Sequence, residues 1–167
     1  ITRLAHDICR DDIRLRDHTF RSLESCLIEM VVALDRYRAY VIPGEDASPE
    51  SERVINRAAD EARQRLDSDD LETLDIVVDL VLGREVGSAG RVNEARRGEL
   101  IIRFQQVCWA VMAKGVPVDS AGQSFRGRRG APGVRDHARH VAQLGEECRE
   151  PLASHNDSSD HPRHKAL

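Results

Sequence analysis

Apolar residues recur at spacings of three and four over most of residues 1–116, which predicts a mainly α-helical chain. The clearest stripe follows Asp17, which can cap a helix over residues 17–36. Its members are Phe20, Leu23, Leu27, Met30, Val31 and Leu34. Ile28 and Val32 widen the stripe, so we expect this helix to be buried on more than one side. A shorter helix is expected over residues 2–10.

Two further helices, joined as a hairpin, are expected over residues 48–83. The inner faces are Val54, Ile55, Ala58, Ala59, Ala62 and Leu66, then Leu71, Leu74, Val77, Val78 and Val81. The expected boundaries are Ser48 with Pro49 at the start, Asp69 and Glu72 as a capping box before the second helix, and Gly83 at its end. The hairpin carries no residue pattern that indicates catalysis, which favours a structural role.

Residues 37–43, YRAYVIP, are rich in aromatic and β-branched side chains and are followed by Gly44. This composition favours one short strand at 38–43 that ends in a turn at Pro43-Gly44. A long helix followed by a buried strand is half of a βαβ unit.

A last helix is expected after a glycine-containing loop at residues 84–93, with Asn93 as its cap. Its apolar face is formed by Leu100, Ile101, Phe104, Val107, Cys108 and Val111. The pattern breaks over residues 112–115, where Gly115 can take a positive φ and Lys114 would lie at a chain reversal. The simplest interpretation is a buried helix whose end carries a solvated lysine.

The character of the chain changes after Val116. Residues 117–167 hold four of the six prolines, five of the seven histidines and one aromatic residue, Phe125. Such a segment buries too little apolar surface to offset its ordering entropy, so we expect it to be mostly disordered. Asp136, His137 and His140 lack a second ordered pair of ligands, so no metal site is expected.

Composition excludes several classes of function. The chain is 40% hydrophobic and 32% charged, with a net charge of −4, which gives no electrostatic case for nucleic acid or an anionic membrane. No apolar run reaches the roughly 18 residues of a membrane span. Gly83 to Gly90, GREVGSAG, lacks the lysine of a phosphate-binding loop, and no cofactor is expected. The four cysteines form no C-x-x-C pair, which indicates reduced thiols in a cytoplasmic protein.

Two motifs carry a family resemblance. RDHT at residues 16–19, followed by YRAYV at 37–41, and RFQQVCWAVMAKGV at 103–116 resemble maltooligosyltrehalose synthase, of the α-amylase superfamily. The family typically has RDFT…PVYRTYV and then RFQQ-x-C-x-x-VMAKG-[VL]-E-D-T. The resemblance implies an internal fragment of a (β/α)8 barrel over residues 1–116, with residues 48–83 as a helical insertion. The family isomerises the terminal α-1,4 linkage of a maltooligosaccharide to an α,α-1,1 linkage, in trehalose biosynthesis.

The same resemblance implies that Lys114 lies near the glucose that is turned round and re-attached. Arg103, Gln106 and Tyr40 are further candidate substrate-binding residues, although the pattern favours structural roles for them: hydrogen bonds within the barrel for Arg103 and Gln106, and the core for Tyr40. No catalytic carboxylate of the family occurs at a recognisable position. The chain alone is therefore expected to be inactive, and a companion chain supplying the missing strands is left open. The alternative is a helical interaction module without enzymatic activity, which would bind a partner through residues 17–36 and 48–83.

The family motif stops abruptly at Val116, where an acidic E-D-T is expected but Pro117 follows. A shift of reading frame explains such a break. Codons for Asn156 to Leu167 can be chosen that, read one base later, spell MTLATTHDTKR, and T-H-D-T-K-R is a family motif at about this distance. We therefore expect residues 117–167 to be an out-of-frame tail.

Overall fold

The structure, a computed structural model, describes residues 1–36, 39–88, 94–115, 135, 136 and 138–141. Within these residues the chain is mainly helical and has no β-strand, which confirms the helical part of the prediction. The α-helices are α1 (Thr2–Arg10), α2 (Phe20–Ala33), α3 (Pro49–Arg63), α4 (Leu71–Leu82) and α5 (Glu94–Gly115), and a 3-10 helix, Ser68–Asp70, precedes α4. None of the helices in these ranges has the length and apolar character needed to cross a membrane.

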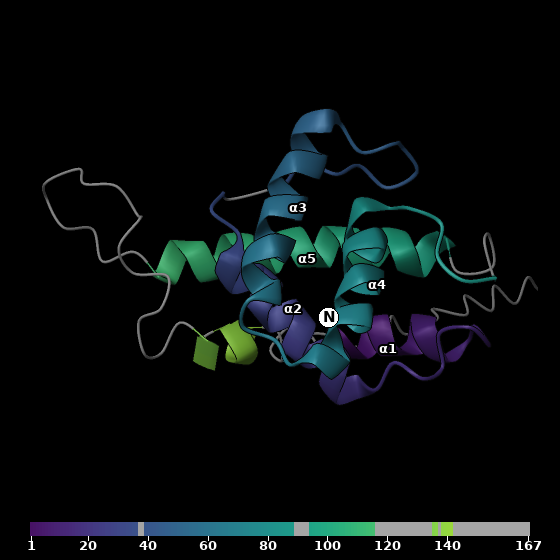
Figure 1. Ribbon diagram of the computed structural model, residues 1–167. Helices are drawn as coiled ribbons and strands as arrows, with labels where there is room; N and C mark the ends of the chain where they lie inside the picture. The colour runs from purple at the N-terminus through teal and green to yellow at the C-terminus, as the bar shows by residue number, and fades with distance from the viewer. Residues whose placement is uncertain (37–38, 89–93, 116–134, 137, 142–167) are drawn as a thin grey trace, which may run out of the picture.

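Helix α2 lies at the centre of the structure. It packs against α1, α3, α4 and α5, and Figure 1 shows α5 crossing behind α4, which it also contacts. Its buried residues are Leu23, Cys26, Leu27, Ile28, Met30, Val31, Val32 and Ala33. The expectation that this helix is buried on more than one side is thus confirmed. One hydrophobic core joins it to the inner faces of the other helices.

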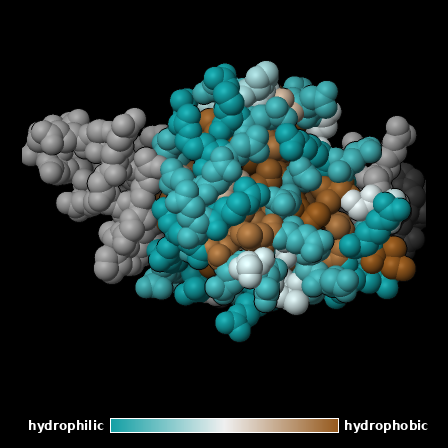
Figure 2. Space-filling model, in the orientation of Figure 1, coloured by the Kyte–Doolittle hydropathy of each residue, from teal (hydrophilic) through white to brown (hydrophobic). Residues whose placement is uncertain are grey.

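Apolar residues also reach the surface. Figure 2 shows them through the middle of the face that carries α3 and α4, bordered by hydrophilic residues. The large hydrophobic side chains that are exposed among the described residues are Ile13, Phe20, Tyr40, Ile42, Ile102 and Trp109. Phe20 was expected in the buried stripe of α2, but it lies at the first residue of the helix, where its ring packs edge-on against that of His6.

The predicted strand is wrong. Residues 39–42 lack regular secondary structure, Pro43 begins a turn, and residue 38 lies outside the described part of the chain. Ala39 and Val41 are buried while Tyr40 and Ile42 are exposed, but φ at Tyr40 is 53°, which is in the left-handed region and not that of an extended strand. A strand also needs a neighbour for its backbone hydrogen bonds, and here the carbonyl of Val41 accepts from the side chain of Gln105 instead, at 2.9 Å.

Two predicted helix boundaries are confirmed. The hydroxyl of Ser48 accepts a hydrogen bond from the backbone N–H of Ser51 at 3.1 Å, and Pro49 is the first residue of α3. Gly83 ends α4 in the left-handed region, at φ 76°.

Three other boundaries differ from the prediction. Thr19, not Asp17, caps α2, because residues 12–18 form turns that delay the helix. Asp69 lies inside the 3-10 helix and does not cap α4. Helix α5 continues through Gly115, so residues 112–115 are helical rather than a turn. Asn93 lies outside the described residues.

A short piece of the tail rests on the core. Residues 135, 136 and 138–141 are helical, and Ala138 is buried. Arg135 forms an ion pair with Glu29 of α2 at 2.7 Å. Residues 116–134 and 142–167, where most of the predicted disorder falls, lie outside the described part.

Asp12 ties the loop after α1 to the loop after α4. Its buried carboxylate accepts hydrogen bonds from the backbone N–H of Ser88 at 2.5 Å and from the Ser88 hydroxyl at 2.9 Å. It also accepts from the backbone N–H of Arg14 at 2.9 Å. Gly87, at φ 75°, passes so close to the carboxylate that a Cβ would collide with it. This contact therefore fixes the loop after α1 against Gly87 and Ser88.

We expect Asp12→Ala to lower the free energy of unfolding by about 1 to 3 kcal/mol, because it leaves three partly buried donors without their acceptor. Asp11→Ala is the control, since Asp11 forms a partly exposed ion pair with Arg96 and should contribute less than about 1 kcal/mol. Urea unfolding followed by circular dichroism measures both. Equal losses in the two variants would contradict the assigned role of Asp12.

Candidate functional site

Helix α5 has two apolar faces. The inner one, which closes the core, consists of Leu100, Ile101, Phe104, Val107, Cys108, Val111 and Met112. The outer one is a line of Ala95, Ile102 and Trp109, which recur every seven residues and are all exposed. Seven residues make almost two helical turns, so these side chains project from one side of the helix. Ile102 is 48% exposed and Trp109 is 53% exposed.

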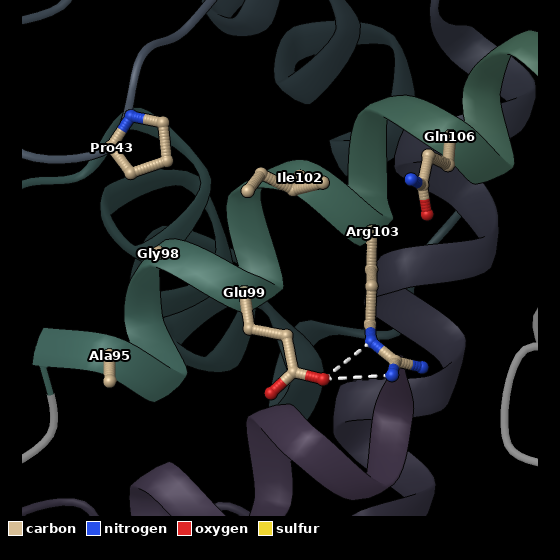
Figure 3. A pocket seen from close by; sticks show the side chains of 7 residues that line it. All are labelled: Pro43, Ala95, Gly98, Glu99, Ile102, Arg103 and Gln106. Atoms are coloured by element: carbon tan, nitrogen blue, oxygen red, sulfur yellow. Dashed lines mark hydrogen bonds and ion pairs between the residues drawn. The ribbon is translucent and has the colours of Figure 1, made fainter. Parts of the chain in front are cut away.

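A concavity of about 710 Å3 lies over the first half of this outer face. It is lined by Pro43, Ala95, Gly98, Glu99, Ile102, Arg103 and Gln106. Figure 3 shows these residues along one side of α5, with Pro43 facing the helix from the neighbouring segment. Gly98 allows this approach, because a Cβ there would lie 3.2 Å from the Cβ of Pro43. The lining combines apolar contacts with three polar side chains.

The charged members of the lining neutralise each other. The guanidinium of Arg103 binds the carboxylate of Glu99 through two nitrogens, each at 2.8 Å, as the dashed lines in Figure 3 mark. The residues are four positions apart, which places them one above the other on the helix. The pair holds both side chains in a defined position, and the surface carries little net charge.

Gln105 positions the other wall of the concavity. Its side-chain amide donates to the carbonyl of Val41 and, more weakly at 3.5 Å, to the carbonyl of Ile101. The segment that leads to Pro43 is therefore attached directly to α5.

The structure brings together two of the four predicted substrate-binding residues. Arg103 and Gln106 line the concavity. Tyr40 is outside the lining and 74% exposed, with φ at 53°, so the expectation that it points inward or into the core is wrong. Lys114 lies in the last turn of α5, about 16 Å along the axis from Arg103, and its side chain is outside the described part.

Trp109 was missed by the sequence analysis. It falls within the RFQQVCWAVMAKGV motif, but it does not belong to the inner stripe that defined the helix. The signal was present as the spacing of seven between Ala95, Ile102 and Trp109, which predicts a second face. An aromatic side chain exposed on such a face is an unusual feature of a solvated helix.

The lining of the concavity offers hydrogen-bonding groups but no pair of carboxylates. Arg103 supplies hydrogen-bond donors, and the amide of Gln106 supplies both a donor and an acceptor. Glu99 is the one carboxylate of the lining, whereas glycoside chemistry uses a pair. Within the described residues, no three His, Cys, Asp or Glu side chains are grouped so that they could hold a metal ion.

Comparison with known proteins identifies no relative: no family model matches the chain, and no curated protein or solved structure does. A function must therefore be argued from the motifs and from the surface of α5.

The described cysteines are structural. Cys9, Cys26 and Cys108 are buried and unpaired. Burial raises the pKa of Cys9 to about 11, against a smaller opposing effect of the Arg97 charge. Burial, helped by the charges of Asp70 and Asp75, raises the pKa of Cys26 to about 12. Burial also raises the pKa of Cys108. All three thiols are therefore poor nucleophiles in the folded chain.

We expect iodoacetamide at pH 8 to leave these three cysteines unmodified in the folded chain and to modify them all in urea, as read by peptide mass spectrometry. Folding raises the thiol pKa above its ordinary value of 9.0. The contribution of the protonated thiols to the free energy of unfolding is therefore fully present below pH 9. It is lost as the pH rises toward 11 and 12, because the unfolded chain ionises first. Native alkylation of Cys26 at the unfolded rate would refute this.

Proposed function

We propose that this chain is a fragment of a maltooligosyltrehalose synthase and that the outer face of α5 is part of its sugar-binding surface. The observation that supports this most is the position of Arg103 and Gln106. Both belong to the RFQQ motif that carries the family resemblance, and both line the concavity.

The chemistry of the concavity suits a glucose unit. A sugar ring has hydroxyl groups around its edge, which Arg103 and Gln106 can bind, and C–H faces that can rest on Ile102 and Pro43. Trp109 lies about 10 Å further along the axis and offers an aromatic face to the next part of a maltooligosaccharide. Lys114, which the resemblance assigns to the sugar, follows Trp109 in the same helix.

The barrel fragment is part of the same proposal. Residues 48–83, which contain α3 and α4, would be the helical insertion. The three unpaired buried thiols are consistent with the reducing cytoplasm as the site of action.

The second candidate is a helical interaction module without enzymatic activity. The exposed apolar line on α5 favours it, because such lines mark contact surfaces. The predicted contact surfaces, residues 17–36 and 48–83, fit less well, because most of α2 is buried in the core.

We expect the purified chain to bind maltopentaose weakly and to form no trehalose-ended product. Binding is measured by NMR titration and turnover by chromatography of the sugars. Gln106→Ala should weaken binding severalfold, since it removes hydrogen bonds to the sugar. Gln64→Ala, an exposed amide at the end of α3, is the matched control and should have no effect. The same affinity in both variants would remove the concavity from the proposal.

Turnover is expected to be absent because double displacement needs a nucleophile and an acid/base carboxylate, and the loss of such groups raises the barrier by several kcal/mol each. Trehalose-ended product that disappears in Lys114→Ala would overturn this expectation.

A separate prediction concerns the coding DNA. If the tail is out of frame, the DNA for residues 156–167 should encode T-H-D-T-K-R when read one base later. Sequencing this region in all three frames tests the prediction directly. A shifted frame without T-H-D-T-K would remove the explanation for the break after Val116, although the motifs before it would stand.

A further inference from the structure

The outer face of α5 presents a projection and a hollow on the same line. Trp109 stands out from the second half of the helix, and the concavity around Ile102 occupies the first half. The separation of Ile102 and Trp109 is seven residues, or about 10 Å along the axis. The face is therefore complementary to itself when a second helix runs in the opposite direction.

We propose that two copies of this chain associate through α5, packed antiparallel, with Trp109 of each copy over the concavity of the other. The arrangement has twofold symmetry, so each contact occurs twice. The indole would lie on Ile102 and Pro43 and beside the guanidinium of Arg103, where a cation–π contact is possible without breaking the pair with Glu99. This proposal does not rest on the proposed function, and its test uses no sugar.

The symmetry axis would pass close to Gln106. When Ile102 of one copy faces Trp109 of the other, the midpoint falls between residues 105 and 106. Gln106 is exposed there, and two side-chain amides related by a twofold axis can each donate to the other. The residue at the centre is thus polar but able to pair with its own copy.

The balance of charge on this face allows a second copy to be the occupant. Two identical surfaces repel when each carries a net charge, but Glu99 and Arg103 compensate each other, and so do Arg96 and Asp11 beside the face. The surface is small, since Ala95 and Trp109 are about 21 Å apart along the helix. Tyr40 and Ile42 add exposed apolar area nearby. An interface of this size is at the lower end of the range for specific complexes, so we expect micromolar or weaker association.

Sedimentation equilibrium of the full 167-residue chain over a wide micromolar range tests the proposal. The expected result is a reversible monomer–dimer equilibrium, and Trp109→Ala should raise Kd at least about tenfold. The control is Ile13→Ala, because Ile13 is more exposed than Trp109 but lies in the loop after α1. A chain that stays monomeric throughout, or an equal effect of Ile13→Ala, would overturn the proposal. Circular dichroism verifies that each variant is folded.

Cross-linking tests the direction of the helices. In a Cys148→Ala background, Gln106→Cys should form a disulfide-linked dimer under mild oxidation, because the two Cα atoms face each other at the axis. Ala95→Cys lies on the same exposed face but would be about 31 Å from its copy in the antiparallel arrangement, and it should not cross-link. Cross-linking of Ala95→Cys as fast as Gln106→Cys, or the failure of Gln106→Cys to cross-link, would refute the geometry.

Discussion

The burial of α2 is the constraint on which the rest of the structure depends. Most of its residues from Leu23 to Ala33 are apolar and inaccessible, so it cannot lie on the surface of a helical layer. A helix that is apolar on several sides needs neighbours on each of them. Helices α1, α3, α4 and α5 provide these neighbours. The loops then have to return the chain to α2 repeatedly, and Asp12 holds two of them together at Ser88.

Helix α5 meets this requirement with one face only, which explains how a site can form on the other. Its inner stripe, centred on Phe104, completes the core. The outer stripe contributes nothing to that packing, so its residues are determined by other needs. Arg103, Gln106 and Trp109 thus occupy a rigid helix without being needed to build it, and a site on a helix is held more firmly than one on a loop.

The helices could be predicted from the sequence because the spacing of apolar residues directly reflects burial in α2 and α5. Local chemistry also predicted Ser48 and Gly83, whose roles depend on nearby backbone alone. The strand at 38–43 could not be predicted correctly, since β-branched composition expresses a preference that only a partner strand can satisfy. Asp17 is not the cap because the turns over residues 12–18 include it, so the helix begins only after Thr19. Of the site, the motif pointed to Arg103 and Gln106, whereas Pro43 reaches them through a contact between distant segments, held by Gln105.

The exposure of Trp109 is a feature that the packing of the fold does not explain. A buried tryptophan would stabilise the core by removing a large apolar area from water, but half of this side chain remains in solvent. Replacing it by a polar residue would leave the contacts of Phe104 and Val107 intact, so the fold alone gives no reason for an aromatic residue here. Trp109 lies two turns from Ile102 and in line with the concavity. A ligand or partner that covers both the indole and the concavity would explain an aromatic residue at this position. A sugar would cover one side of the indole, whereas a second copy of α5 would cover the whole outer face of the helix.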